Sequence, residues 1–184
     1  MASEIKAARD GKKIDLLLNV AGLLHEQGSS GYMPERSLSS IDADQMAKVL
    51  RTNAIGPVLV TQAVSPQLDR GAIIANLSAR VGSISDNRLG GWWSYRMSKA
   101  ALNMATVNMA HELKRKDVIA VALHPGTTDT GLSEPFQKNV KPEKLFSPAY
   151  SAGSILDVLQ GLKPEDSGKF FAFDGSLILS LIHI

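Results

Sequence analysis

The chain has 184 residues, of which 44% are hydrophobic and 21% charged, with a formal net charge of +2. This length supports one domain with a full core, and the composition is typical of a globular protein. The lysines and arginines are scattered along the sequence, which argues against a nucleic-acid-binding surface. The absence of cysteine excludes disulfides and cysteine zinc sites, and the four histidines lack the spacing of metal ligands. No metal site is therefore expected.

The apolar pattern predicts alternating strands and helices, which is typical of an α/β fold with a parallel sheet and right-handed crossovers. The apolar run 14–20 is short and continuous, so we expect a strand buried on both faces. The expected elements in chain order are a helix tail (2–10), a strand (14–20), a loop (23–40), two helical runs (41–53 and 54–68), a strand (71–77), a loop (79–93), a helix (94–114), a strand (118–123), a long loop (127–145), a helix (148–162) and a strand (169–173).

Two local signals refine the first helical region. Ser40 is expected to cap the first helical run, because serine oxygens accept hydrogen bonds from the free N–H groups at a helix start. Gly56 and Pro57 should kink or divide the region, since proline lacks the N–H that a helix interior needs.

Tyr95 and Lys99 stand four residues apart in the predicted helix 94–114. One helical turn places the two side chains on the same face. A cation beside a phenol favours the phenolate, so we expect Lys99 to lower the pKa of Tyr95. Such a pair can donate and accept a proton near neutral pH, which carbonyl reduction or alcohol oxidation requires.

Further motifs accompany this pair: Asn19-Val20-Ala21-Gly22, Asn53 with Gly56, Asn76-Leu77-Ser78-Ala79 and His124-Pro125-Gly126. In this order and spacing, the chain resembles the short-chain dehydrogenase/reductase family, in particular its C-factor-like carbonyl reductases. The resemblance covers roughly residues 14–175 and implies that Tyr95 is the acid and base and that Lys99 activates it.

The resemblance also implies the other site residues. Asn53 would sit at a helix irregularity and extend a proton relay. The implied cofactor is NADP or NAD, with NADP mildly preferred, and the implied substrate is a small-molecule carbonyl or alcohol. The implied cofactor-binding residues are Asn19, Ala21, Gly22, Tyr95, Lys99, Pro125, Gly126 and Thr128.

Two serines are candidates for the hydroxyl that, by resemblance, would bind the substrate carbonyl. The family's second serine in this region aligns with Ala79, and Ser78 lies one residue earlier. Adjacent strand residues point to opposite faces, so Ser78 inherits the role only if the strand has ended. Ser83 is another available hydroxyl, but we assign Ser78 as the candidate catalytic serine.

The family's first strands and glycine-rich turn are not found before Asn19. The expected fold is therefore a parallel-sheet Rossmann-like domain lacking these parts, a partial dinucleotide-binding domain over 1–175 followed by an atypical apolar tail over 176–184. The strand around Leu16–Leu18 should then have an exposed flank that favours association with other chains.

Two further functions are weighed against an oxidoreductase. The first alternative is a catalytically inactive fragment that retains the family's subunit-association surface. The second is a hydrolase that uses Ser78 and His124, although the sequence contains no Gly-x-Ser-x-Gly elbow. By resemblance, the helices near 42–68 and 94–114 would form a homo-oligomer.

No apolar stretch reaches the roughly 18 residues of a membrane span, and no signal peptide is evident, so a cytoplasmic location without membrane partners is expected. Organellar targeting stays open, because an N-terminal part is expected to be missing.

Overall fold

The structure, a computed structural model, describes residues 11–27 and 31–180. The expected helix tail over 2–10 lies outside the described residues. The elements in chain order are β1 (Ile14–Asn19), α2 (Ala43–Leu50), a π-helix (Arg51–Ile55), α3 (Gly56–Val64), β2 (Leu68–Leu77), α4 (Trp93–Glu112), β3 (Ile119–His124), β4 (Thr127–Thr128), β5 (Leu145–Phe146), α5 (Pro148–Gln160) and β6 (Phe170–Ala172), with short 3-10 turns between them.

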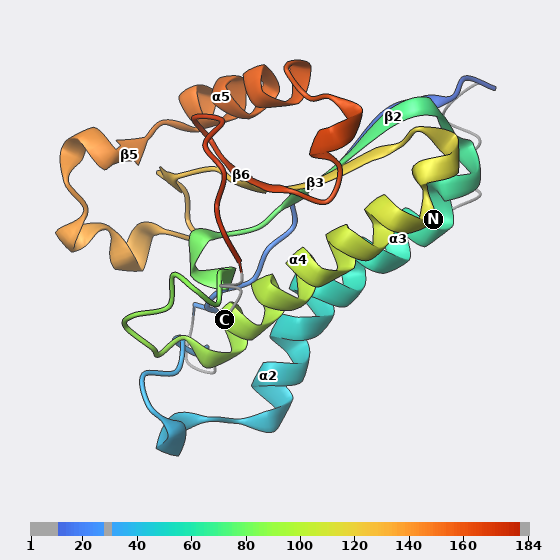
Figure 1. The fold of residues 1–184 in the computed structure, drawn as a ribbon. Coiled ribbons are helices and arrows are strands. Elements are labelled where there is room, and N and C mark those ends of the chain that lie inside the picture. The colour runs from blue at the N-terminus through green and yellow to red at the C-terminus, as the bar shows by residue number, and fades with distance from the viewer. Residues whose placement is uncertain (1–10, 28–30, 181–184) are drawn as a thin grey trace.

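Four parallel strands form the main sheet in the order β1-β2-β3-β6, so the predicted parallel α/β architecture is confirmed. Helix α5 covers one face, and α2, α3 and α4 lie on the other (Figure 1). Because all four strands run the same way, their carboxyl ends meet at one edge of the sheet. In open parallel sheets, this edge is where ligands bind.

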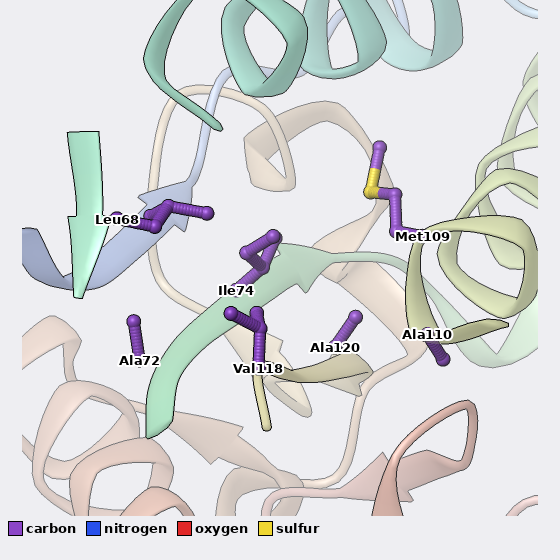
Figure 2. Close-up of a cluster of buried hydrophobic side chains, with 7 residues drawn as sticks. All are labelled: Leu68, Ala72, Ile74, Met109, Ala110, Val118 and Ala120. Carbon is purple, nitrogen blue, oxygen red and sulfur yellow. The ribbon is translucent and has the colours of Figure 1, made fainter. Parts of the chain in front are cut away.

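Two apolar clusters hold the layers together. Between the sheet and α4, Ile74 and Ala120 pack against Met109, as Figure 2 shows. On the opposite face, Val121 and Leu123 pack against Ile155 of α5. Strand β3 is buried along most of its length because it lies between β2 and β6 with helices on both sides.

Strand β1 corrects one expectation. The apolar run 14–20 predicted burial on both faces, but Leu16 is 41% exposed and Val20 is 56% exposed. Among the described residues, β1 pairs only with β2, so it forms an edge of the sheet. The expected exposed flank at Leu16–Leu18 is therefore confirmed.

The first helical region also differs from expectation. Asp42, not Ser40, caps α2, because its carboxylate accepts a hydrogen bond of 2.8 Å from the N–H of Gln45. Ser40 instead ends a separate 3-10 turn. The predicted division near Gly56 is confirmed, but it takes the form of a π-helix within one continuous helical segment.

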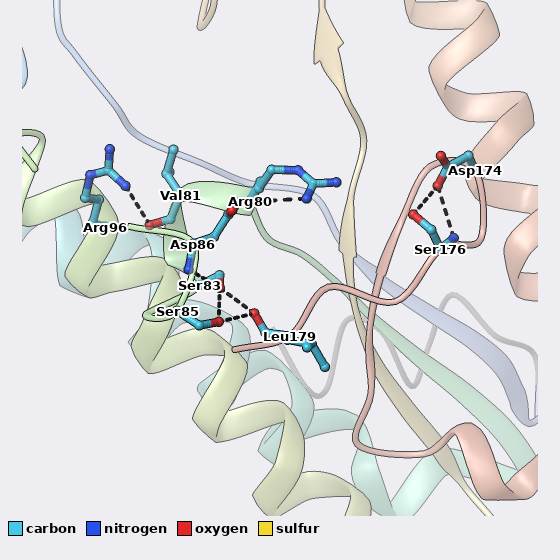
Figure 3. A network of polar contacts seen from close by, with 9 residues as sticks. All are labelled: Arg80, Val81, Ser83, Ser85, Asp86, Arg96, Asp174, Ser176 and Leu179. Atoms are coloured by element: carbon cyan, nitrogen blue, oxygen red, sulfur yellow. Dashed lines mark hydrogen bonds and ion pairs between the residues drawn. The ribbon is translucent and has the colours of Figure 1, made fainter. Parts of the chain in front are cut away.

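The remaining differences concern boundaries. Strand β2 begins at Leu68, three residues before the predicted start, and the predicted loop 127–145 contains the parallel pair β4–β5 near its ends. The tail packs on the domain: the N–H of Ile178 donates to the carbonyl of Phe170 (2.8 Å). Figure 3 shows Ser83 and Ser85 donating to the carbonyl of Leu179.

Helices that are both long and apolar enough to cross a bilayer do not occur in the described part of the chain.

Candidate active site

Tyr95 and Lys99 lie one turn apart near the start of α4 and are both buried, with 8% and 3% of their surface exposed. The Lys99 Nζ lies 5.7 Å from the centroid of the Tyr95 ring. The same nitrogen donates a hydrogen bond of 2.8 Å to the carbonyl of Leu77, the last residue of β2. The amine therefore ties the helix to the strand end and holds the pair at the carboxyl edge of the sheet.

Burial controls the titration of both groups. It raises the pKa of Tyr95 to about 12, because a phenolate loses solvation inside the protein. It lowers the pKa of Lys99 to about 8, because the ammonium loses solvation in the same way. The expectation that Lys99 lowers the pKa of Tyr95 is not met in this structure. At neutral pH, Tyr95 is a protonated phenol and Lys99 a cation.

The pair lines a cleft of about 560 Å³ at the carboxyl ends of β1, β2 and β3. This volume lies within the range of small-molecule sites. Of the predicted site residues, the cleft lining includes Gly22, Ser78, Tyr95, Lys99, Pro125, Gly126 and Thr128. The structure thus brings together predicted site residues from four separate parts of the sequence.

Asn53 lies in the π-helix and is fully buried. Its amide oxygen accepts from the N–H of Leu23 (2.6 Å), and its amide nitrogen donates to the carbonyl of Leu23 (2.8 Å) and to the Ser98 hydroxyl (3.0 Å). The Ser98 hydroxyl in turn donates to the carbonyl of Tyr95. Asn53 therefore fastens the turn that follows β1 to the first turns of α4.

Asn19 lies outside the cleft lining. Its amide donates to the Asn76 side chain (2.8 Å), and the Asn76 amide donates to Thr106 (2.9 Å). These bonds join β1, β2 and α4. Ala21 also lies outside the lining, although Gly22 beside it belongs to it. A Cβ at Gly22 would lie 3.9 Å from Lys99 Nζ, so the backbone here runs close to the Tyr95–Lys99 pair.

Ser78 follows the end of β2, so the condition for its side chain to be redirected is met. Its hydroxyl donates a hydrogen bond of 2.7 Å to the Asn103 side chain of α4. The hydrolase hypothesis requires the Ser78 hydroxyl to donate to His124. In the structure it donates to Asn103 of α4 instead. Ser83, the other available hydroxyl, donates to the tail at Leu179 instead. Ala79 lines the cleft beside Ser78.

The turn after β3 is held from α5. The hydroxyl of Ser151 donates to the carbonyl of Pro125 (2.9 Å) and accepts from Thr128 (3.0 Å). Gly126 has a φ of +78°, and a Cβ there would meet the Phe146 ring at 2.5 Å. Glycine is therefore required for both conformation and space.

Sequence reasoning missed two residues near the cleft, Trp92 and Glu35, and named a third, His124, in a motif and in the hydrolase hypothesis. His124 lines the cleft, and burial, with a smaller contribution from Arg80, lowers its pKa to about 4. Trp92 caps α4 in a left-handed conformation (φ 49°) and packs edge-on against Tyr95. The Glu35 carboxylate accepts from the N–H and hydroxyl of Ser94. His124 stood in a quoted motif, whereas nothing local in the sequence marks Glu35.

Comparison with known proteins gives a consistent result. The family model for short chain dehydrogenases matches residues 2–141. The chain is 33% identical over 173 residues to 1-hydroxy-2-glutathionyl-2-methyl-3-butene dehydrogenase of Rhodococcus sp. (strain AD45), covering 94% of this chain and 71% of that protein. It is 38% identical over 165 residues to C-signal of Myxococcus xanthus, covering 89% and 90% of the two chains.

Solved structures share the fold. The NADPH-bound carbonyl reductase from chicken fatty liver is 30% identical, with a TM-score of 0.83 over 97% of this chain and 70% of that chain. The carbonyl reductase Sniffer of D. melanogaster is 25% identical, with a TM-score of 0.83 over 97% and 71%. The chain therefore belongs to the short-chain dehydrogenase family of NAD(P)-dependent oxidoreductases, and within it resembles carbonyl reductases and C-signal.

Proposed function

We propose that the protein reduces a small carbonyl compound, or oxidises the corresponding alcohol, with Tyr95 as acid and base and Lys99 as its activator. The observation that carries this proposal is the buried Tyr95–Lys99 pair inside a cleft at the carboxyl ends of parallel strands. A protonated phenol at neutral pH supplies the proton that a carbonyl oxygen needs during reduction.

The residues of the cleft fit the nicotinamide end of a dinucleotide. Gly22 and Gly126 allow the backbone to approach a ligand closely. The Lys99 ammonium has three N–H donors, and within the described residues it uses one of them, for the hydrogen bond to the Leu77 carbonyl. The nicotinamide would supply the hydride. Lys99 would bind ribose hydroxyls, and Thr128 with the Pro125–Gly126 backbone would hold the carboxamide and phosphate side. Asn19 and Ala21 would flank the adenosine side of the same cleft.

NADP is the preferred cofactor in this proposal. Support comes from a solved relative whose structure holds NADPH. Carbonyl reduction is favoured as the direction because the relatives in solved structures are carbonyl reductases.

Proton delivery would depend on the contacts around Tyr95. Tyr95 donates its proton to the carbonyl oxygen, while the Lys99 cation stabilises the negative charge that develops on the phenol oxygen. Asn53 positions the helix that carries both side chains, through Ser98 and the carbonyl of Tyr95. Ser78 is the candidate that orients the substrate carbonyl. To do so, its hydroxyl has to exchange Asn103 for the substrate.

A homo-oligomer through the helical segments near 42–68 and 94–114 is part of the proposal. Large apolar side chains on these helices face solvent: Ile55 is 49% exposed, Leu59 is 52% exposed and Met97 is 45% exposed. Contacts between copies would bury this surface, since apolar area removed from water stabilises association.

A second candidate is a non-catalytic protein that retains only the association surface. It is favoured by the edge of β1, which pairs with no further strand among the described residues and leaves backbone groups free to pair with another chain.

Cofactor binding separates the two candidates. Titrating NADPH and NADH against the protein, with nicotinamide fluorescence as the signal, should show saturable binding if the oxidoreductase proposal holds. Protein that associates into oligomers without binding either cofactor would instead support the second candidate.

Catalysis is then tested with Tyr95→Phe on a panel of aldehydes and ketones, by following NADPH oxidation. The proposal expects a loss of at least about 100-fold, the usual contribution of a general acid. Tyr150→Phe is the matched control, because Tyr150 is 54% exposed and packs on Phe146 away from the pair. Equal rates for both variants would remove Tyr95 as the proton donor.

A further inference from the structure

The helix that carries Tyr95 and Lys99 is capped from a distant part of the chain. Trp92, the residue before α4, has a left-handed backbone (φ 49°), and its side chain makes no capping hydrogen bond to a described residue. The first N–H groups of a helix need acceptors, which a neighbouring side chain usually supplies. Here the acceptors belong to Glu35, which lies 59 residues before Ser94 in the sequence.

Glu35 supplies two acceptors to this helix start. Its backbone carbonyl accepts a hydrogen bond from the N–H of Trp92. Its carboxylate accepts from the N–H of Ser94 (3.1 Å) and from the Ser94 hydroxyl. A carboxylate suits this place, because the N-terminal end of a helix carries partial positive charge. Glu35 is only 3% exposed, so water hardly competes for these hydrogen bonds.

Tyr95 directly follows the residue that the Glu35 carboxylate binds. Its ring packs edge-on against the indole of Trp92, with the two ring centroids 6.2 Å apart. Glu35 thus holds the backbone of Trp92 through its carbonyl and the backbone of Ser94 through its carboxylate. A shift of this turn would displace the Tyr95 ring in the cleft, and a displacement of about 1 Å at a reacting group can slow an enzyme about 100-fold.

We propose that Glu35 is a positioning residue for Tyr95, which sets the place of the phenol in the cleft by binding the first turn of α4. This inference rests on the proposed function, because a reaction that uses Tyr95 as its proton donor needs the phenol in one place.

The role of Glu35 is geometric rather than electrostatic. Burial alone raises the pKa of Tyr95, whereas burial together with the charges of Glu26 and Glu35 raises the pKa of Tyr32. The Glu35 charge therefore acts on Tyr32 and not on the proposed proton donor. A neutral side chain of the same length should replace Glu35, since glutamine keeps an acceptor for the Ser94 N–H and a donor for its hydroxyl.

Three substitutions separate geometry from charge. Glu35→Leu has a similar size and no acceptor, Glu35→Asp keeps the charge on a shorter side chain, and Glu35→Gln keeps the length without the charge. We expect kcat for carbonyl reduction to fall about 10- to 100-fold in Glu35→Leu and Glu35→Asp, and to stay within about threefold in Glu35→Gln. The KM for NADPH should change by less than about twofold in all three, because Glu35 lies outside the cleft lining. Glu112→Leu, at the exposed end of the same helix, is the matched control and should leave kcat unchanged.

Fluorine NMR of protein labelled with 3-fluorotyrosine follows Tyr95 without any reaction. The chain contains three tyrosines, so Tyr→Phe variants assign the three signals. The Tyr95 signal should move in Glu35→Leu and keep its position in Glu35→Gln. The signal of Tyr150, which is 54% exposed, is the internal reference and should not move. Glu35→Asp stays polar and takes the place of Glu35→Leu in this measurement if the leucine variant does not fold.

The inference and the proposed function fail in different ways. In a protein that reduces carbonyls, the inference is overturned if Glu35→Leu leaves either kcat or the Tyr95 signal unchanged. It is also overturned if Glu35→Gln loses as much activity as Glu35→Leu, since the charge would then matter and not the geometry. If the unchanged protein reduces no carbonyl, the proposed function fails, and the Tyr95 signal still decides whether Glu35 sets the position of the phenol.

Discussion

Replacing Lys99 by methionine should stabilise the fold at neutral pH while removing activity. The amine is 3% exposed, and burial lowers its pKa from the ordinary 10.5 to about 8. At neutral pH, the buried charge of Lys99 therefore lowers the free energy of unfolding. Methionine has a similar length and carries no charge, so Lys99→Met removes the penalty with little change in volume.

The magnitude follows from the pKa. A fall from 10.5 to about 8 corresponds to about 3 kcal/mol against the charged form. The lost hydrogen bond to the Leu77 carbonyl offsets about 1 kcal/mol of this gain. We therefore expect Lys99→Met to raise the free energy of unfolding at pH 7 by about 2 kcal/mol.

The pH dependence gives the sharper test. The unfolded chain binds the Lys99 proton up to pH 10.5, and the folded protein releases it near pH 8, so the stability of the unchanged protein rises between these values. The advantage of Lys99→Met should shrink over the same window. Urea unfolding at pH 7 and pH 10 measures this difference, with the exposed Lys138→Met as control. An advantage that is the same at both pH values would refute the role of burial.

Three further predictions concern the same region. Asn53→Ala should lower the free energy of unfolding by about 2–4 kcal/mol, since it removes the three hydrogen bonds of a fully buried side chain; a loss below 1 kcal/mol in urea unfolding would contradict this. Gly126→Ala should lower the melting temperature, because its methyl group would meet an aromatic ring at 2.5 Å, whereas Gly131→Ala has open space and should be neutral. Carbonyl reduction should slow as pH rises through about 8, where Lys99 loses its charge, and a flat kcat/KM profile from pH 7 to 9 would argue against a catalytic cation.

The strands were predictable because short apolar runs bounded by turn residues leave few alternatives. The run 118–123 became β3 (Ile119–His124), and the Tyr95–Lys99 spacing placed both side chains on one helical face. The prediction that the apolar run 14–20 is buried on both faces was wrong, however. The side chains of a strand predict that it forms, but they do not reveal whether neighbouring elements cover it.

Contacts between distant segments explain the other differences. The pKa of Tyr95 depends on how completely the surrounding elements exclude water, which the spacing to Lys99 does not reveal. Glu35 and Ser94 are 59 residues apart in the sequence, so no local pattern predicts the hydrogen bond between them. Ser40 and Asp42 are both good caps, and only the three-dimensional path decides that the carboxylate meets the helix start.

The π turn at Arg51–Ile55 gives the α2–α3 segment one residue more than a regular helix of that span needs. Removing a residue there, such as Thr52, would let the backbone return to ordinary α-helical bonding. The shorter helix would gain regularity but rotate the Asn53 amide away from Leu23. A deletion that improves the local backbone should thus loosen the turn after β1. Insertions and deletions in this stretch should be poorly tolerated even though Arg51 and Ile55 face solvent.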